Sequence, residues 1–438
     1  MKGGIAVFLA CVIAGVALYY QSDEVAKNAA LNGEFMSLYG AARAAHEHRG
    51  LYASEEAPSG AAVAEQKAGD RKEVSPDAEV APDEAGSTDS ALAEKKAAST
   101  DSVLTAGAAF SYPPYFALVM LPLSFIDALE TAALTWYWTN VALFIVAMFF
   151  AVYTLAGTFA TGERALFLVP LVIAVPLIAW YLPVQSTAVL ALTLVLAGLC
   201  LFRAKLDIPS GIVSSLALFS PLGVVFVIYY LAKRAWLAVA GILIGAIVWF
   251  AVIPAIYFGP QTALEESQNY VGAVLLPLPA RMMSEEVLAS GDNYSLWAML
   301  ARNTEGIKNL GAEAVKYGEA YKVNMPEGDW RPIVSVSLGV IMLVLTLLGI
   351  WRKPNDRDLT IYGLEGAQLI LAVLLLSPYT PLGAYILAVV GLFAAVYVIR
   401  STDVRKFVHH VNYVGLILAG QLFCLAYFSE SARLAGAA

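Results

Sequence analysis

Long apolar segments separated by short basic turns constrain this sequence more than any other feature. Apolar residues make up 59% of the chain and charged residues only 14%, against roughly 25% charged residues in soluble domains. Most of the apolar segments approach the length of about 20 residues that a helix needs to cross a bilayer. We therefore predict an all-α polytopic membrane protein, with residues 1–438 forming a single integral membrane domain.

The apolar segments also predict where the spanning helices lie. An uncleaved first helix is expected at residues 4–20, because no small-residue cleavage site follows this segment; a cleaved signal peptide is the alternative. Proline and glycine interrupt residues 204–232, so two short helices or a re-entrant hairpin fit there better than one span. Further spans are expected at 133–156, 166–183, a segment ending at 203, 236–258, 333–351, 359–377, 382–399 and 411–428.

Basic residues mark the turns that we assign to the cytoplasm. Pairs of them stand at residues 203–205, 233–234, 352–353 and 405–406. The positive-inside rule then places the amino terminus in the cytoplasm and both long polar loops outside. We expect a multi-pass protein of the plasma (inner) membrane, with exported loops at residues 21–132 and 259–331.

The first exported loop contains two segments of different character. Residues 53–105 are rich in Ala, Glu, Asp, Ser, Lys and Pro and contain no aromatic residue, so they cannot bury enough apolar surface to fold. We interpret them as a disordered insert. Residues 114–126 would form a helix about 20 Å long, too short for a hydrocarbon core of about 30 Å, and should lie at the membrane surface or dip into it partway.

Glu34 is the best candidate for chemistry in a chain with so few exported carboxylates on ordered segments. Asn32 can cap a helix whose first turn holds Glu34. Phe35, Leu38 and Tyr39 then follow at helical spacing, which predicts an apolar face lying on the bilayer. An acid in a first helical turn also complements the helix dipole, so a purely structural role is the alternative.

Three other groups of polar residues are candidates for a functional role. Glu365 lies inside an apolar segment, where a charge is costly and is usually functional or paired. His46 and His48 offer two imidazoles without a third ligand nearby, so no metal is expected. In the second exported loop, a surface helix ending near Arg302 could hold an anionic head group, or it could be a plain surface helix.

The order of several motifs resembles glycosyltransferase family 87, whose members are membrane-embedded enzymes of the GT-C type. The family usually has Asp-Phe, a Tyr and an Ala-Ala-Arg-Ala-like helix near its first loop, then Tyr-Pro-Pro, a Gln, an Asn-Gln-Ser-Leu pattern and a late Ser-Pro. The corresponding positions here are residues 34–44, residues 112–118, Gln185, residues 293–296 and residues 377–378.

The sequence departs from this pattern in four places. Glu34 stands where Asp is usual, and residues 218–221 lack the Lys that often precedes the mid-chain proline. Pro381 and Ala384 occupy positions where Trp and His are frequent. The insert at 53–105 is also unusually long. The first change keeps a carboxylate and moves it by one methylene.

The resemblance implies a GT-C fold with roughly 10–12 transmembrane helices of about 20 residues each. It implies transfer of a hexose, most readily mannose, from a polyprenyl-phosphate donor to a lipid or glycan acceptor at the outer face. Glu34 would act as general base with inversion, and no cofactor is expected, although a loosely bound divalent cation is compatible. The residues expected to bind donor or acceptor are Tyr39, Arg43, Tyr112, Gln185, Asp292, Asn293, Ser295, Arg302 and Glu365.

Two other functional classes remain open from the sequence. A secondary transporter also uses broken helices and an intramembrane acid such as Glu365. A catalytically inactive scaffold of the same fold is suggested by the missing Lys in 218–221. The bilayer is an expected partner, and nucleic acid is not, because no basic stripe is present.

The predicted orientation can be tested by cysteine labelling in intact cells. A cysteine placed at Asn293 should react with a membrane-impermeant thiol reagent, and one placed at Lys353 should react only after the membrane is opened, because the basic turns lie inside. A cysteine within residues 4–20 that stays unreactive in both states is the control. The reverse labelling pattern would invert the topology and remove Glu34 from the exterior.

Overall fold

The computed structural model contains only helices and turns in the part of the chain that it describes. No strand occurs among these residues, and the all-α class is confirmed. The described residues are 18–29, 33–52, 110–156, 181–278, 359–377 and 379–401, with isolated positions at 15, 16, 170, 171, 174, 178, 281 and 295. The insert 53–105 and the predicted spans 333–351 and 411–428 lie outside them.

The helices follow the apolar segments of the sequence. Residues 18–27 are helical, so the first helix continues past the apolar segment into polar residues. The next elements are α2 (Gly33–His46), α5 (Pro114–Val119), α6 (Leu121–Ser124), α7 (Leu129–Ala156), η3 (Leu182–Val184), α9 (Ala188–Arg203), α10 (Asp207–Leu216), η4 (Ala217–Phe219) and α11 (Pro221–Ala232). Then come α12 (Trp236–Ile247), η5 (Val248–Val252), α13 (Ile253–Phe258), α14 (Pro260–Asn269), η6 (Tyr270–Leu275), α20 (Leu359–Leu376), η7 (Leu382–Leu387) and α21 (Ala388–Ser401).

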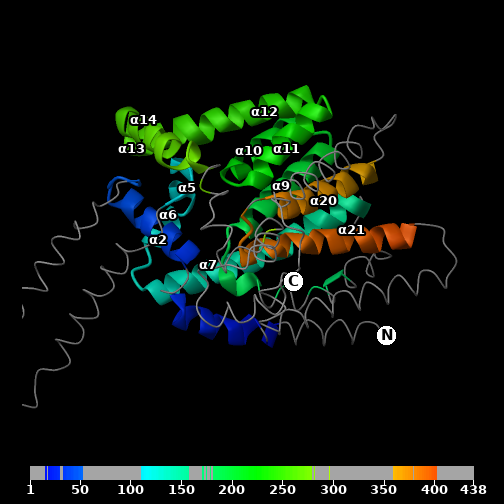
Figure 1. Ribbon diagram of the computed structural model, residues 1–438, viewed down its shortest axis with the longest axis horizontal. Coiled ribbons are helices and arrows are strands. Elements are labelled where there is room, and N and C mark those ends of the chain that lie inside the picture. Colours follow the sequence, from blue (N-terminus) through cyan, green and yellow to red (C-terminus); the bar gives the residue numbers. More distant parts are fainter. Residues whose placement is uncertain are drawn as a thin grey trace, which may run out of the picture.

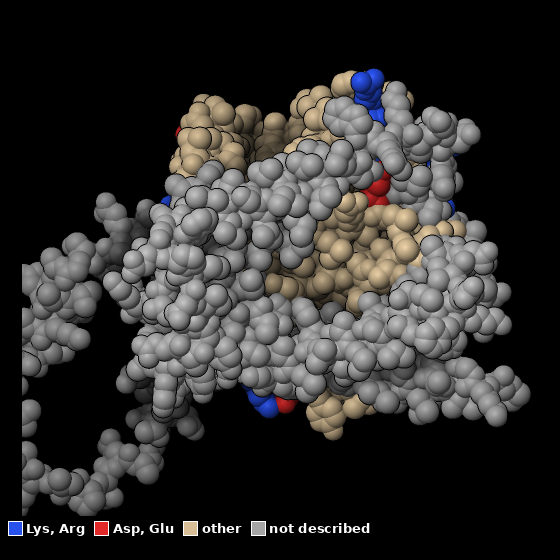
Figure 2. Space-filling model, turned by 45° about the vertical axis from the view of Figure 1, so that its right-hand side comes forward, with Lys and Arg blue, Asp and Glu red and all other residues tan. Residues whose placement is uncertain are grey.

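Two of the described helical segments are long and apolar enough to cross a membrane. They are Leu129–Ala156 and the continuous segment Trp236–Phe258. The second exposes large apolar side chains that water would solvate poorly: Leu243 and Ile247 are each 62% exposed, and Ile256 is 79% exposed. Figure 2 shows charged side chains at only a few places on one face of the described surface. This surface suits a hydrocarbon environment.

The helices of the bundle run roughly side by side, and shorter elements gather at one end of it. In Figure 1 helices α7, α9, α12, α20 and α21 extend from left to right, while α2, α5, α6, α13 and α14 lie at the left end. The candidate base Glu34 belongs to this cluster of short elements. The single helix predicted at residues 114–126 is instead two shorter helices, α5 and α6, which are separated at Met120. Pro122 has no N–H with which to continue the hydrogen bonding of α5.

The stretch between the basic turns at 203–205 and 233–234 forms two short helices, one of the two arrangements predicted. Ser220 caps α11 by accepting a hydrogen bond from the amide of Leu222 at 3.3 Å, and Pro221 begins that helix. Helix α10 packs closely on α12 at Gly211. A Cβ added to this glycine would lie only 2.0 Å from the carbonyl oxygen of Ala238, which leaves no room for a larger residue. Small residues allow such close packing of apolar helices.

Glu365 is paired within the bundle. Its carboxylate contacts Lys233 Nζ at 2.5 Å and accepts a hydrogen bond from the Tyr229 hydroxyl at 2.9 Å. The side chains of Lys233 and Glu365 are only 6% and 5% exposed. The pair connects α20 to the end of α11. The Lys233 ammonium and the Tyr229 hydroxyl offset the desolvation of the Glu365 charge within an apolar helix.

Removing one member of this buried pair should destabilise the protein strongly. Lys233→Met leaves an unpaired buried carboxylate, a change that typically costs about 3–5 kcal/mol. We expect a clearly lower thermal unfolding midpoint in detergent, and partial recovery in the double variant Lys233→Met/Glu365→Met. Lys27→Met is the control, because Lys27 contacts Asp23 at the same 2.5 Å while both side chains are exposed. An unchanged midpoint in Lys233→Met would contradict the prediction.

Two further contacts join the residues that follow α2 to α13 and α14. The Leu51 amide donates to both carboxylate oxygens of Glu266 at 3.3 Å, and the His48 ring stacks on Tyr257 at 5.4 Å between centroids. Burial is the largest cause that raises the pKa of Glu266 above its ordinary value of 4.5, and the charge of Glu265 adds to it. The Leu51 amide opposes this shift without cancelling it.

The raised pKa of Glu266 gives stability a specific pH dependence. Folding favours the protonated acid, so its contribution is fully present below pH 4.5 and is lost as the pH rises through the folded-state pKa. Glu266→Gln cannot titrate, so the wild-type unfolding midpoint should fall relative to that of this variant across the same window. Glu130→Gln, at an exposed carboxylate, should not remove this loss. Parallel profiles for wild type and Glu266→Gln would refute the shift.

Candidate active site around Glu34

Helix α2 is held in the protein by the face that was predicted to lie on the bilayer. Phe35, Leu38 and Ala42 are fully buried, and Tyr39 is 1% exposed. The prediction of a lipid-covered face is wrong, because the short helices α5 and α6 cover that face instead. Periodicity identified the buried side of the helix correctly. The predicted cap, Asn32, lies outside the described residues.

Four donors converge on one oxygen of Glu34. Its Oε1 accepts hydrogen bonds from the amide and from the hydroxyl of Thr187, each at 2.8 Å. The Tyr112 hydroxyl donates at 3.0 Å, and the Ser186 hydroxyl lies at 3.5 Å. Among the described residues, none donates to the other oxygen, Oε2. The carboxylate, which is partly exposed, is therefore fixed through one atom, while its other oxygen accepts no hydrogen bond from the described residues.

Thr187 offers its amide because it stands at the start of α9. The first N–H groups of a helix have no partner within the helix, and the helix dipole favours a negative charge there. The turn before it is anchored to α7: the Gln185 side chain donates to the Ala133 carbonyl at 3.2 Å, and Trp136 donates to the Gln185 carbonyl at 2.9 Å. Gln185 adopts a left-handed conformation, with φ 59°.

Tyr112 joins the first loop to this turn. Besides donating to Glu34, its hydroxyl lies 3.2 Å from Thr187 Oγ1, and its carbonyl accepts from Tyr52. Burial, followed by the negative charge of Glu34, raises the pKa of the Tyr112 hydroxyl well above its ordinary value. The phenol therefore keeps its proton and acts as a neutral donor to the carboxylate.

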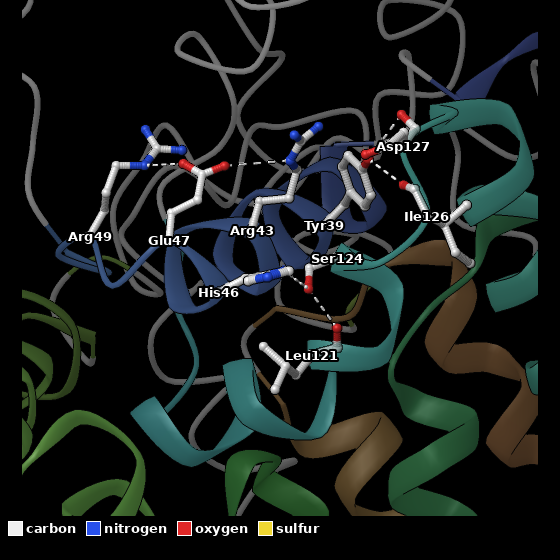
Figure 3. Close-up of polar contacts among 9 residues, drawn as sticks. All are labelled: Tyr39, Arg43, His46, Glu47, Arg49, Leu121, Ser124, Ile126 and Asp127. Carbon is white, nitrogen blue, oxygen red and sulfur yellow. Dashed lines mark hydrogen bonds and ion pairs between the residues drawn. The ribbon is translucent and has the colours of Figure 1, made fainter.

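Tyr39 and Arg43 lie on α2 and are engaged by partners other than Glu34: Figure 3 shows Tyr39 directed at Ile126 and Asp127, and Arg43 at Glu47. The Tyr39 hydroxyl donates to the Ile126 carbonyl at 2.8 Å, and the Arg43 guanidinium lies 5.9 Å from the centre of the Tyr39 ring. Arg43 follows Glu34 by nine residues, which is two and a half turns at 3.6 residues per turn and places it on the opposite side of the helix. Its ionic contact is Glu47 Oε1 at 3.8 Å.

The remaining residues of the predicted site fall into four groups. Gln185 is buried behind Glu34 and positions the turn that carries Thr187. Glu365, on α20, lies beside the later turns of α9, because its neighbour Gly366 packs against Leu199. Leu199 is twelve residues, or roughly 18 Å, along α9 from Thr187. Ser295 is buried, at 1% exposure. The second-loop residues Asp292, Asn293 and Arg302 lie outside the described residues.

Thr187 and Ser186 were not identified from the sequence. A faint signal was present, since a Gln-Ser-Thr triplet directly precedes a long apolar segment. Ser and Thr are common at such positions because they cap helices. The sequence does not reveal that the same groups bind a carboxylate 153 residues earlier in the chain.

Comparison with known proteins identifies the family. The model of glycosyltransferase family 87 matches residues 110–378, a segment that includes Tyr112, Thr187 and Glu365 and begins after Glu34. Comparisons with curated proteins and with solved structures found no match. Because the matched segment exceeds half of the 438 residues, the chain belongs to glycosyltransferase family 87.

Proposed function

We propose that this glycosyltransferase moves a hexose from a polyprenyl-phosphate donor to a lipid or glycan acceptor at the outer membrane face. Mannose is the proposed sugar, because the family resemblance is to polyprenyl-phosphate-mannose-dependent enzymes. Glu34 is the proposed general base, and the reaction inverts the anomeric centre. The observation that supports this role is a carboxylate fixed through Oε1, with no donor to Oε2 in the described part of the chain.

The proposed reaction needs one proton acceptor and one leaving group. Oε2 of Glu34 takes the proton of the acceptor hydroxyl while that oxygen forms a bond to the anomeric carbon. The bond from the anomeric carbon to the phosphate oxygen breaks, and its electron pair leaves with polyprenyl phosphate. Inversion requires the base to lie on the face of the sugar opposite the leaving phosphate. A positioned general base contributes about 10²–10⁴-fold to such a step.

The leaving phosphate needs a positive partner, which we place outside α2. Arg43 points away from the side of the helix that carries Glu34, so it does not stabilise a phosphate beside Oε2. Arg302, in the second exported loop, remains the predicted partner for the anionic group. A basic side chain would serve this purpose by charge stabilisation, so the reaction is proposed to need no cofactor, and a loosely bound divalent cation is compatible with it.

The two other functional classes have less support. A transporter would use Glu365 as a titrating acid, yet Glu365 is paired with Lys233 and Tyr229, and the chain belongs to a glycosyltransferase family. An inactive scaffold would not need an oriented carboxylate. The donors that converge on Glu34 Oε1 instead favour an enzyme in which this acid acts.

Substitution of Glu34 tests the proposal directly. Glu34→Gln keeps the size and hydrogen-bonding capacity of the side chain but cannot take the proton. Transfer from labelled polyprenyl-phosphate mannose in proteoliposomes should therefore fall by about 10²-fold or more, with donor binding retained. Glu34→Asp should keep measurable activity, because a carboxylate remains.

The matched control is Glu47→Gln on the same helix. Glu47 is 44% exposed and contacts only Arg43 and Arg49 among the described residues, so its rate should equal that of wild type. Glu34→Gln transferring sugar at the wild-type rate would show that the base lies elsewhere. Wild-type transfer from a nucleotide sugar but not from the polyprenyl-phosphate donor would refute the donor class.

A further inference from the structure

We infer that Thr187 is a positioning residue that occupies Oε1 of Glu34 and thereby reserves Oε2 for the proton of the acceptor hydroxyl. This inference rests on the proposed role of Glu34 as general base. It starts from the distribution of hydrogen bonds: the two carboxylate oxygens are chemically equivalent, yet the described donors all bond to Oε1. Thr187 alone supplies two short hydrogen bonds to Oε1, one from its amide and one from its hydroxyl, both at 2.8 Å.

Oε1 is unsuited to receive a proton in this arrangement. A carboxylate oxygen has two lone pairs, and Oε1 already has three donors within 3.0 Å when Tyr112 is included. Hydrogen bonds to a charged acceptor, such as this carboxylate, are stronger than those between two neutral groups. Protonation at Oε1 would displace them, whereas protonation at Oε2 leaves every one in place. The acceptor hydroxyl should therefore approach Oε2.

The two hydrogen bonds from Thr187 to Oε1, which we call the Thr187 clamp, also restrict rotation of the long Glu34 side chain. A glutamate rotates about three bonds, and a displacement of about 1 Å from the reacting atoms can cost on the order of 10²-fold in rate. Two of the hydrogen bonds come from one residue and the third from Tyr112, on a different loop. The carboxyl group is thus fixed both in position and in the direction that Oε2 faces.

The support behind Thr187 is rigid, which a positioning residue requires. Gln185 and Trp136 fasten the preceding turn to α7. On another side, η7 approaches Ser186 closely: a Cβ added to Gly383 would lie only 2.4 Å from Ser186 Cβ. The Thr187 amide and hydroxyl therefore point at Glu34 from an end of α9 that is packed against two other elements.

The hydroxyl contribution can be isolated, because the amide remains whatever side chain stands at 187. Thr187→Val keeps the shape of the side chain and removes only the hydroxyl, while Thr187→Ser keeps the hydroxyl. The matched control is Thr193→Val on the same helix. Thr193 is also buried, but its hydroxyl bonds to the carbonyls of Val189 at 2.7 Å and Leu143 at 3.1 Å, away from Glu34.

The experiment measures kcat and donor KM in proteoliposomes, per mole of folded protein. Thr187→Val should lower kcat by roughly 10-fold, a fraction of the loss that a misplaced base can cause, and leave donor KM within about twofold of wild type. Thr187→Ser should restore kcat to within about threefold of wild type, and Thr193→Val should leave it unchanged. In a Glu34→Gln background, Thr187→Val should lower the residual rate no further, because residues that act as a unit are not additive.

Other outcomes would overturn the inference, and they are distinguishable from failure of the proposed function. Wild-type kcat in Thr187→Val, while Glu34→Gln is inactive, would refute the positioning role alone. An equal kcat loss in Thr193→Val, or the same further loss in the Glu34→Gln background, would show a merely structural effect. Full activity of Glu34→Gln would refute the proposed base and the inference together.

Discussion

The geometry of the candidate site depends on the attraction between a carboxylate and the start of helix α9. Glu34 approaches from α2 and Tyr112 from the segment before α5, and both meet at Thr187. A helix N-terminus is suited to this because its unpaired amides and its dipole both favour an anion. One interaction therefore joins three segments that are distant in the sequence, and all the donors that it brings together bond to the same carboxylate oxygen.

Helix α9 also separates two carboxylates that sequence analysis grouped in one site. Glu34 is held at its first residues, while Glu365 lies beside its later turns and is paired with Lys233. The two acids solve different problems. A charge buried among helices requires a partner to offset its desolvation, and Lys233 supplies it. The proposed base needs one oxygen that can receive a proton, and both hydrogen bonds from Thr187 go to the other oxygen, Oε1.

Local pattern predicted much of the fold, and tertiary contacts decided the rest. Apolar length and proline or glycine breaks predicted α7 and the pair α10 and α11, and they predicted one short helix where the structure has α5 and α6. The spacing of Phe35, Leu38 and Tyr39 showed which face of α2 is buried, but not that protein rather than lipid covers it. Thr187 could not be found, because Ser and Thr at a helix start more often cap their own helix than bind a distant acid.

The length of the Glu34 side chain fits the same geometry. From the first turn of α2, the Glu34 side chain spans the gap to Thr187 with hydrogen bonds of 2.8 Å. An aspartate at this position would be shorter by one carbon–carbon bond, about 1.5 Å, and would lose these contacts unless α2 moved toward α9. Such a movement is opposed by the buried face of α2 and by the Leu51–Glu266 contact at its far end. The extra methylene of glutamate is therefore matched to the distance between the two helices and keeps the carboxylate within reach of Thr187.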